Sequence, residues 1–215
     1  MKTGIPLMQT LLLVTVAAVL FGCASSPQAR FYTLNPLGFP EAKQPAPAAA
    51  HPVSVSIAPV EIPDYLDRPQ IVTRDGRNEL RLAEFDRWAG SLSDNITAVL
   101  AENLAQLLGT DRIFVYPRLQ AEKAEFSVMT RVLRLDCKPG EQVFLKVQWT
   151  LLSGPERKDV ATQVASFTER LNDNRYETIA AAVSRTLEQL SREIARTISD
   201  RLKGAASSAV LQGSP

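Results

Sequence analysis

Acidic side chains cluster in residues 61–86, where paired carboxylates could serve acid and base hydrolysis if a fold held them on facing walls of a cleft. The carboxylates alternate with arginines, so ion pairs at a surface or an interface are the favoured interpretation. No glycine-rich phosphate loop, GxSxG or HExxH motif is present, and the sequence therefore predicts a protein that is not an enzyme. The acidic residues are Glu61, Asp64, Asp67, Glu84 and Asp86, and the arginines are Arg68, Arg74, Arg81 and Arg87.

Metal-binding and nucleophilic residues are scarce, with one histidine and two cysteines in 215 residues. His51 lies in a proline-rich segment without a second histidine or a CxxC motif, so no metal site and no cofactor are predicted. Cys137 is expected to be a buried small residue, without a disulfide partner if Cys23 is modified. The formal net charge of +1, from 24 basic and 23 acidic residues, argues against a nucleic-acid partner.

The N-terminal residues 1–22 have the three parts of a secretory signal peptide. Lys2 supplies the positive start, residues 11–20 are apolar, and small residues surround the exit. The ending Leu20-Phe21-Gly22-Cys23 resembles the lipobox of bacterial lipoproteins, which implies cleavage before Cys23 and lipidation of its thiol. The alternative is an ordinary cleaved signal in which Cys23 is incidental.

Lipidation of Cys23 would fix the protein to a membrane, because two or more acyl chains hold a protein on a bilayer whereas one binds reversibly. Ala24 follows the cysteine, in place of the aspartate that usually retains lipoproteins at the inner membrane. The resemblance therefore implies the periplasmic face of the outer membrane.

Residues 23–52 comprise the lipidated anchor, a short strand and a linker. Aromatic and β-branched residues predict the strand at 31–34, and prolines and alanines predict a semi-stiff linker after it. If the strand pairs into the domain, the tether is only residues 24–30 and spans at most roughly 25 Å. If the strand is loose, the tether extends to residue 52.

Residues 53–203 are predicted to form one α+β domain, a two-layer sandwich of one mostly antiparallel sheet with two helices on one face. Alternation of apolar and polar residues predicts a half-buried strand at 53–60, a hairpin at 71–82, a strand at 113–116 and a meander at 124–136, 142–152 and 160–171. Apolar spacings of three and four predict helices at 92–108 and 176–203. Residues 204–215 are predicted to be a disordered tail.

Large apolar side chains stand among charges and prolines in residues 62–74 and 82–89. Mixed aromatic and arginine surfaces of this kind suit protein interfaces, so the block is a candidate site for a partner or a second copy of the chain. The alternative is that these residues close the sheet edge and the helix entry. The candidate residues are Tyr65, Leu66, Asp67, Arg68, Phe85, Arg87 and Trp88.

This block also resembles a known family, the PqiC/YmbA-like auxiliary lipoproteins of ABC-type transport systems. The resemblance rests on the lipobox, on Phe31-Tyr32-Thr33-Leu34, on Pro63-Asp64-Tyr65-Leu66-Asp67-Arg68-Pro69 with Ile71-Val72-Thr73-Arg74, and on Glu84-Phe85-Asp86-Arg87-Trp88-Ala89. It implies an outer-membrane lipoprotein that works with a PqiA-like inner-membrane protein and a PqiB-like MCE protein spanning the periplasm, in moving lipids between membranes. The family has no established catalytic residues to carry over.

The anchor and the block together predict a docking module. Acyl chains on Cys23 would restrict the domain to the membrane surface and raise its effective concentration for a partner arriving from the other membrane. A homo-oligomer of several copies around a tubular partner could close into a ring. The alternative is a lipid-binding carrier, in which the sheet and helices enclose an apolar cavity, and a periplasmic hydrolase is a more distant third.

Overall fold

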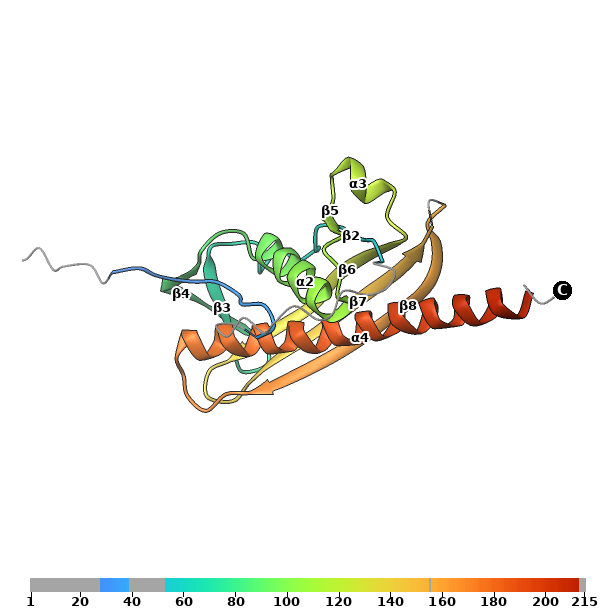
Figure 1. The fold of residues 1–215 in the computed structure, drawn as a ribbon. Coiled ribbons are helices and arrows are strands. Elements are labelled where there is room, and N and C mark those ends of the chain that lie inside the picture. The colour runs from blue at the N-terminus through green and yellow to red at the C-terminus, as the bar shows by residue number, and fades with distance from the viewer. Residues whose placement is uncertain (1–27, 39–52, 155, 213–215) are drawn as a thin grey trace, which may run out of the picture.

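A computed structural model of the chain describes residues 28–38, 53–154 and 156–212 (Figure 1). Within these ranges the chain forms two sheets and three helices, which confirms the predicted α+β class. The predictions for the signal peptide, for lipidation of Cys23, for His51 and for the linker after residue 38 lie outside the described residues.

The larger sheet has five strands in the order β5-β2-β6-β7-β8. Its second half is the predicted antiparallel meander, while β2 pairs in parallel with both β5 and β6. The sheet is therefore mixed. The strands are β2 (Val55–Ile57), β5 (Ile113–Val115), β6 (Phe126–Lys138), β7 (Gln142–Ser153) and β8 (Lys158–Arg170).

Strand β2 is buried on both faces, whereas its alternating sequence predicted a half-buried strand. Ser54 and Ser56 are almost fully buried, because each finds a hydrogen-bond partner on the neighbouring part of the chain. The two hydroxyls of Ser56 and Ser127 lie 2.7 Å apart, and Ser54 Oγ accepts from the Glu125 amide at 3.0 Å. Small hydroxyl residues tolerate burial when they are bonded in this way.

The predicted hairpin forms a second sheet instead of joining the first. Its strands β3 (Gln70–Asp75) and β4 (Glu79–Trp88) are antiparallel, and β1 (Arg30–Tyr32) pairs in parallel with β4. The order is β1-β4-β3. The tetrapeptide at 31–34 is thus part of the domain, which favours the short tether.

Helix α2 (Leu92–Leu108) has the boundaries that its sequence predicts. Ser91 Oγ accepts a hydrogen bond from the Asp94 amide, and Gly109 ends the helix at φ 61°, a left-handed conformation that glycine adopts without steric cost. Helix α3 (Leu119–Glu122) was not predicted, since a single turn carries no periodic signal.

Helix α4 (Tyr176–Gln212) runs past residue 203 through most of the segment that was expected to be disordered. The extension contains three alanines, at 205, 206 and 209, and no proline before the last residue. Alanine has the highest helix propensity and proline the lowest, which explains why the helix does not end at Gly204.

The core fills the space between the larger sheet and the helices. Helices α2 and α4 cover one face of this sheet (Figure 1), as predicted. Trp149 on β7 and Ile194 on α4 have no exposed surface, and the Trp149 indole donates to Glu193 Oε1 at 3.1 Å. The inward residues of β7 are all buried: Val143, Leu145, Val147, Trp149 and Leu151.

Acid should weaken the start of α4. Asp173 accepts hydrogen bonds from Arg175 Nε at 2.7 Å and from the Arg175 amide at 2.9 Å, and these bonds, with one from Thr178, lower the pKa of Asp173 to about 2 from a usual value of 3.8. A carboxylate with a lowered pKa stabilises the fold above its unfolded pKa and loses that contribution as the pH falls through its folded pKa.

We therefore expect Asp173→Asn to be less stable than the natural chain at pH 7, and the difference to vanish between about pH 4 and pH 2. Urea unfolding of both proteins across this range measures it. A difference that stays constant with pH would show that the charge of Asp173 is not what stabilises α4.

Candidate functional site

The structure separates the seven candidate interface residues into buried and accessible groups. Leu66 and Trp88 are each only 3% exposed and belong to the core, so neither side chain offers surface to a partner in the single chain. Trp88 is held inward where its amide donates to the Pro69 carbonyl at 2.7 Å, and the turn that starts at Pro63 folds Leu66 back onto the core. The burial of these two residues agrees with the alternative interpretation, in which they close the sheet edge and the helix entry.

Tyr65 is half-buried and joins the 63–69 segment to β6. Its hydroxyl accepts from the Leu135 amide at 3.2 Å and lies 3.5 Å from the Leu135 carbonyl oxygen. Tyr65 therefore supports the segment from within the domain.

The remaining four candidates are accessible. Asp67 is exposed, and Arg68, Phe85 and Arg87 are half-buried. The Nε atoms of Arg68 and Arg87 are buried without a hydrogen-bond partner among the described residues. Buried donors usually have partners, so these two Nε atoms are exceptions within the domain; Nη2 of Arg87 lies 3.5 Å from the Glu84 carbonyl oxygen.

Phe31 extends the accessible group, although sequence reasoning did not include it. Phe31 is 63% exposed and is the register partner of Arg87 on β4. Register partners stand on the same face of a sheet, as do residues two apart on one strand, so Phe31, Phe85 and Arg87 form one strip, called here the aromatic–arginine strip. The sequence predicted that Phe31 lies in a strand, but only the fold shows that this strand places Phe31 opposite Arg87 on β4.

Ion pairs account for two of the five clustered carboxylates, Glu61 and Asp86, and their partners are arginines from outside the cluster. Glu61 pairs with Arg131 on β6, and Arg74 pairs with Asp136. Asp86 is 5% exposed and binds both Nε and Nη2 of Arg30, at 2.8 and 2.9 Å, while the Tyr32 hydroxyl donates to it at 2.7 Å. Burial alone would raise the pKa of Asp86, but these hydrogen bonds hold it below its usual value.

The Asp86 cluster attaches the N-terminal segment to the domain. Beyond it, the Tyr32 and Tyr176 rings lie 6.4 Å apart between centroids, and the Leu37 amide donates to the buried Asn103 at 2.7 Å. The segment that follows the expected anchor is therefore fixed to β4, α2 and α4.

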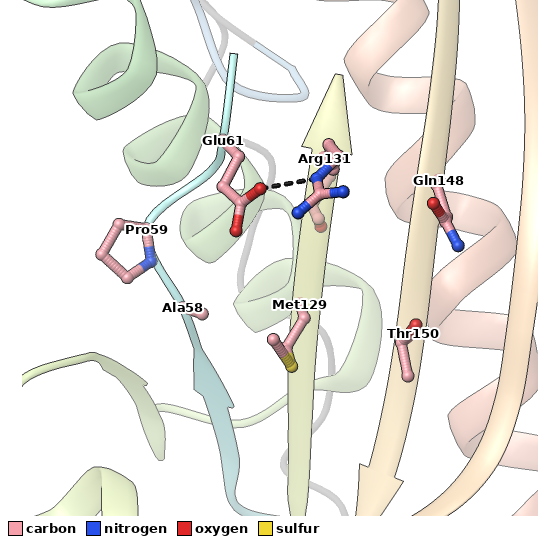
Figure 2. A pocket seen from close by; sticks show the side chains of 8 residues that line it. Ala58, Pro59, Glu61, Met129, Arg131, Gln148 and Thr150 are labelled. Atoms are coloured by element: carbon pink, nitrogen blue, oxygen red, sulfur yellow. Dashed lines mark hydrogen bonds and ion pairs between the residues drawn. The ribbon is translucent and has the colours of Figure 1, made fainter. Parts of the chain in front are cut away.

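A shallow pocket of about 210 Å³ lies on the face of the larger sheet that points away from the helices (Figure 2). It opens where Pro59 leads the chain away from β6, and the Glu61–Arg131 ion pair stands at its edge. A second pocket of about 250 Å³ is lined by Arg134, Asp136, Lys138, Gln142 and Phe144. Charged linings of this kind do not suit an acyl chain.

Cys137 is buried, as predicted, and burial raises the pKa of its thiol to about 12. In the ranges that the structure describes, no three His, Cys, Asp or Glu side chains come together as metal ligands. None of the described helices combines the length and the apolar character needed to cross a membrane.

Comparison with known families matches residues 32–195 to the family described as ABC-type transport auxiliary lipoprotein component. Comparison with curated proteins finds no match. A solved structure titled only as an uncharacterized protein has a TM-score of 0.65 at 16% identity, covering 80% of this chain and 99% of its own. Protein XCC0632 from Xanthomonas campestris, of family DUF330, has a TM-score of 0.64 at 16% identity and covers 82% and 99%. These two likenesses show a shared fold.

Proposed function

Since this chain belongs to the family of ABC-type transport auxiliary lipoproteins, we propose that it docks a PqiB-like MCE protein at the periplasmic face of the outer membrane. The lipid anchor on Cys23 would hold the domain there, and a PqiA-like inner-membrane protein would complete a system that moves lipids between the two membranes. The family description is that of a transport component and not of an enzyme. The sequence motifs that resemble PqiC/YmbA support the particular system.

The observation that carries the proposal is the attachment of β1 to the domain. Arg30 is bound to Asp86, so only residues 24–30 separate Cys23 from the folded part. Seven residues span at most about 25 Å. A domain on so short a tether stays at the membrane surface, where its effective concentration for an arriving partner is high.

The aromatic–arginine strip, with Asp67 and Arg68 beside it, is the surface proposed for the partner or for a neighbouring copy in a ring. Aromatic residues and arginine are the types that contribute most to binding at interfaces, and Phe31 is 63% exposed here while Phe85, Arg68 and Arg87 are half-buried. Tyr65, Leu66 and Trp88 would act indirectly, by packing against the domain and so fixing the position of the backbone that carries the strip.

The carrier alternative is less well supported. The space between sheet and helices is filled by fully buried side chains such as Trp149, Leu190 and Ile194, and both described pockets have charged linings. Native mass spectrometry distinguishes the two, because a carrier would retain lipid through purification whereas a docking module would be empty.

We expect the double substitution Phe85→Ala with Arg87→Ala to weaken binding of the MCE protein at least about tenfold, the usual size of a central interface effect. Pull-down and light scattering on the protein alone and on the mixture would measure binding and oligomer size. Val164→Ala with Arg131→Ala is the matched control, since it removes one exposed apolar residue and one arginine from the other sheet. Equal binding by the two variants would place the interface elsewhere.

A further inference from the structure

We propose that the turn end of the β3–β4 hairpin rests on the same lipid surface that holds the anchor, with Leu80 and Leu82 at the boundary between headgroups and acyl chains. The inference rests on the proposed anchoring through Cys23. It adds a second, non-covalent contact between the domain and the bilayer, and it assigns the orientation of the domain on the membrane.

Two leucines stand exposed near the turn of this hairpin. Leu80 is 37% and Leu82 is 49% exposed, and as residues two apart on β4 they share one face. The register partner of Leu82, Val72, is buried. The register partner of Leu80 is Arg74, which donates to Asp136 on β6 at 2.6 Å. The hydrophobic core therefore ends beside Leu82, and toward the turn a polar contact joins the hairpin to β6 while Leu80 and Leu82 stay partly uncovered.

The tether leaves the domain toward this end of the hairpin. Strand β1 is parallel to β4 with Arg30 opposite Asp86, so the chain before Arg30 leaves on the side where β4 begins. Cys23 comes seven residues before Arg30, and Glu79, beside the turn, comes seven residues before Asp86. A strand rises about 3.3 Å per residue, and the register of β4 shifts between Leu82 and Arg87, so the turn lies at most about 23 Å from Arg30. This distance is within the reach of an extended tether.

Figure 1 agrees with this arrangement. The described N-terminal segment, in blue, lies on the side of the molecule that holds β3 and β4, and the C-terminal end of α4 lies at the opposite side. A bilayer held by a tether of at most about 25 Å on this side of the molecule can therefore lie against the hairpin.

The charges at the turn suit phospholipid headgroups. Arg77 lies in the exposed turn, and Arg81, 66% exposed at its side chain, pairs with the exposed Asp75 and Glu79. Apolar residues beside arginines are typical of amphipathic helices that lie in the membrane interface, and this hairpin brings the same residue types together, with Asp75 and Glu79 balancing the two arginines. Two leucines would bind a bilayer weakly by themselves, but a tether supplies a high effective concentration, so we assign the contact to the lipidated protein.

The test uses the full lipidated protein in vesicles of phosphatidylethanolamine and phosphatidylglycerol. Leu82→Cys and Val164→Cys are each labelled with an environment-sensitive fluorophore, and Val164 is the control because it is 57% exposed on β8 of the other sheet. Cys137 remains unlabelled, since it is buried and its pKa is raised to about 12. Flotation with the vesicles is measured first, and then emission and quenching by brominated lipid.

We expect the protein to float and the probe at 82 to shift to the blue and be quenched, while the probe at 164 keeps its emission in water. If the protein floats and both probes keep that emission, the anchor stands and the hairpin contact is wrong. If the protein does not float, the anchoring itself fails and the hairpin contact fails with it.

Discussion

Replacing Trp149 with alanine is expected to lower the free energy of unfolding by about 4 kcal/mol. The indole has no exposed surface, lies between β7 and α4, and donates to Glu193. Truncation would leave a cavity in the middle of the two-layer core and an unpaired acceptor beside it. Urea unfolding followed by circular dichroism measures the loss.

Trp149→Phe is the matched control, because it keeps most of the ring volume and removes the hydrogen bond; its expected cost is about 1 to 2 kcal/mol. A loss below about 1 kcal/mol for Trp149→Ala would mean that the layers do not pack tightly around this side chain. That result would favour the carrier over the docking module.

Asp86→Ala is expected to release β1 at a cost of about 2 kcal/mol, the typical value for hydrogen bonds to a charged group. The substitution removes the acceptor of Arg30 and Tyr32, both of which bind the same carboxylate. Trypsin cuts after Arg30, and cleavage there needs β1 to open locally. A change of about 2 kcal/mol should raise the cleavage rate about thirtyfold where opening precedes cleavage.

Glu84→Ala is the control for this experiment, since Glu84 is an exposed carboxylate two residues earlier on the same strand. It should leave cleavage at Arg30 unchanged. If Asp86→Ala also leaves it unchanged, other contacts hold the N-terminal segment, and the Asp86 cluster does not determine the length of the tether.

Periodicity predicted the elements that have a clear apolar face. Helix α2 and strands β6, β7 and β8 lie within about two residues of their predicted bounds. Apolar residues at every third or fourth position face one side only in a helix, and alternating apolar residues face one side only in a strand. The caps of α2 also have local signals: the sequence offers Ser91 or Ser93 for the N-cap, of which the structure uses Ser91, and Gly109 for the C-cap.

Pairing and burial of the short strands depended on contacts distant in sequence. The pattern around residue 31 predicts a strand, but nothing local indicates that β1 joins β4, or that the hairpin forms its own sheet. Trp88 and Leu66 stand among charged residues and were therefore expected at the surface, yet the turn at 63–69 and the pairing of β4 bury both. The candidate site was found as a region, while its accessible residues, Phe31 among them, required the fold.

Helix α4 gives the domain a long axis with two different ends. Its first turn lies beside β1, where Tyr176 contacts Tyr32, and 37 residues of helix extend over about 55 Å. A reporter fused after the helix would therefore sit far from the tether, and a 30° tilt of the domain would move it by about 28 Å. Energy transfer from labelled lipids to such a reporter would read the inclination of the protein on its membrane directly, before and after a partner binds.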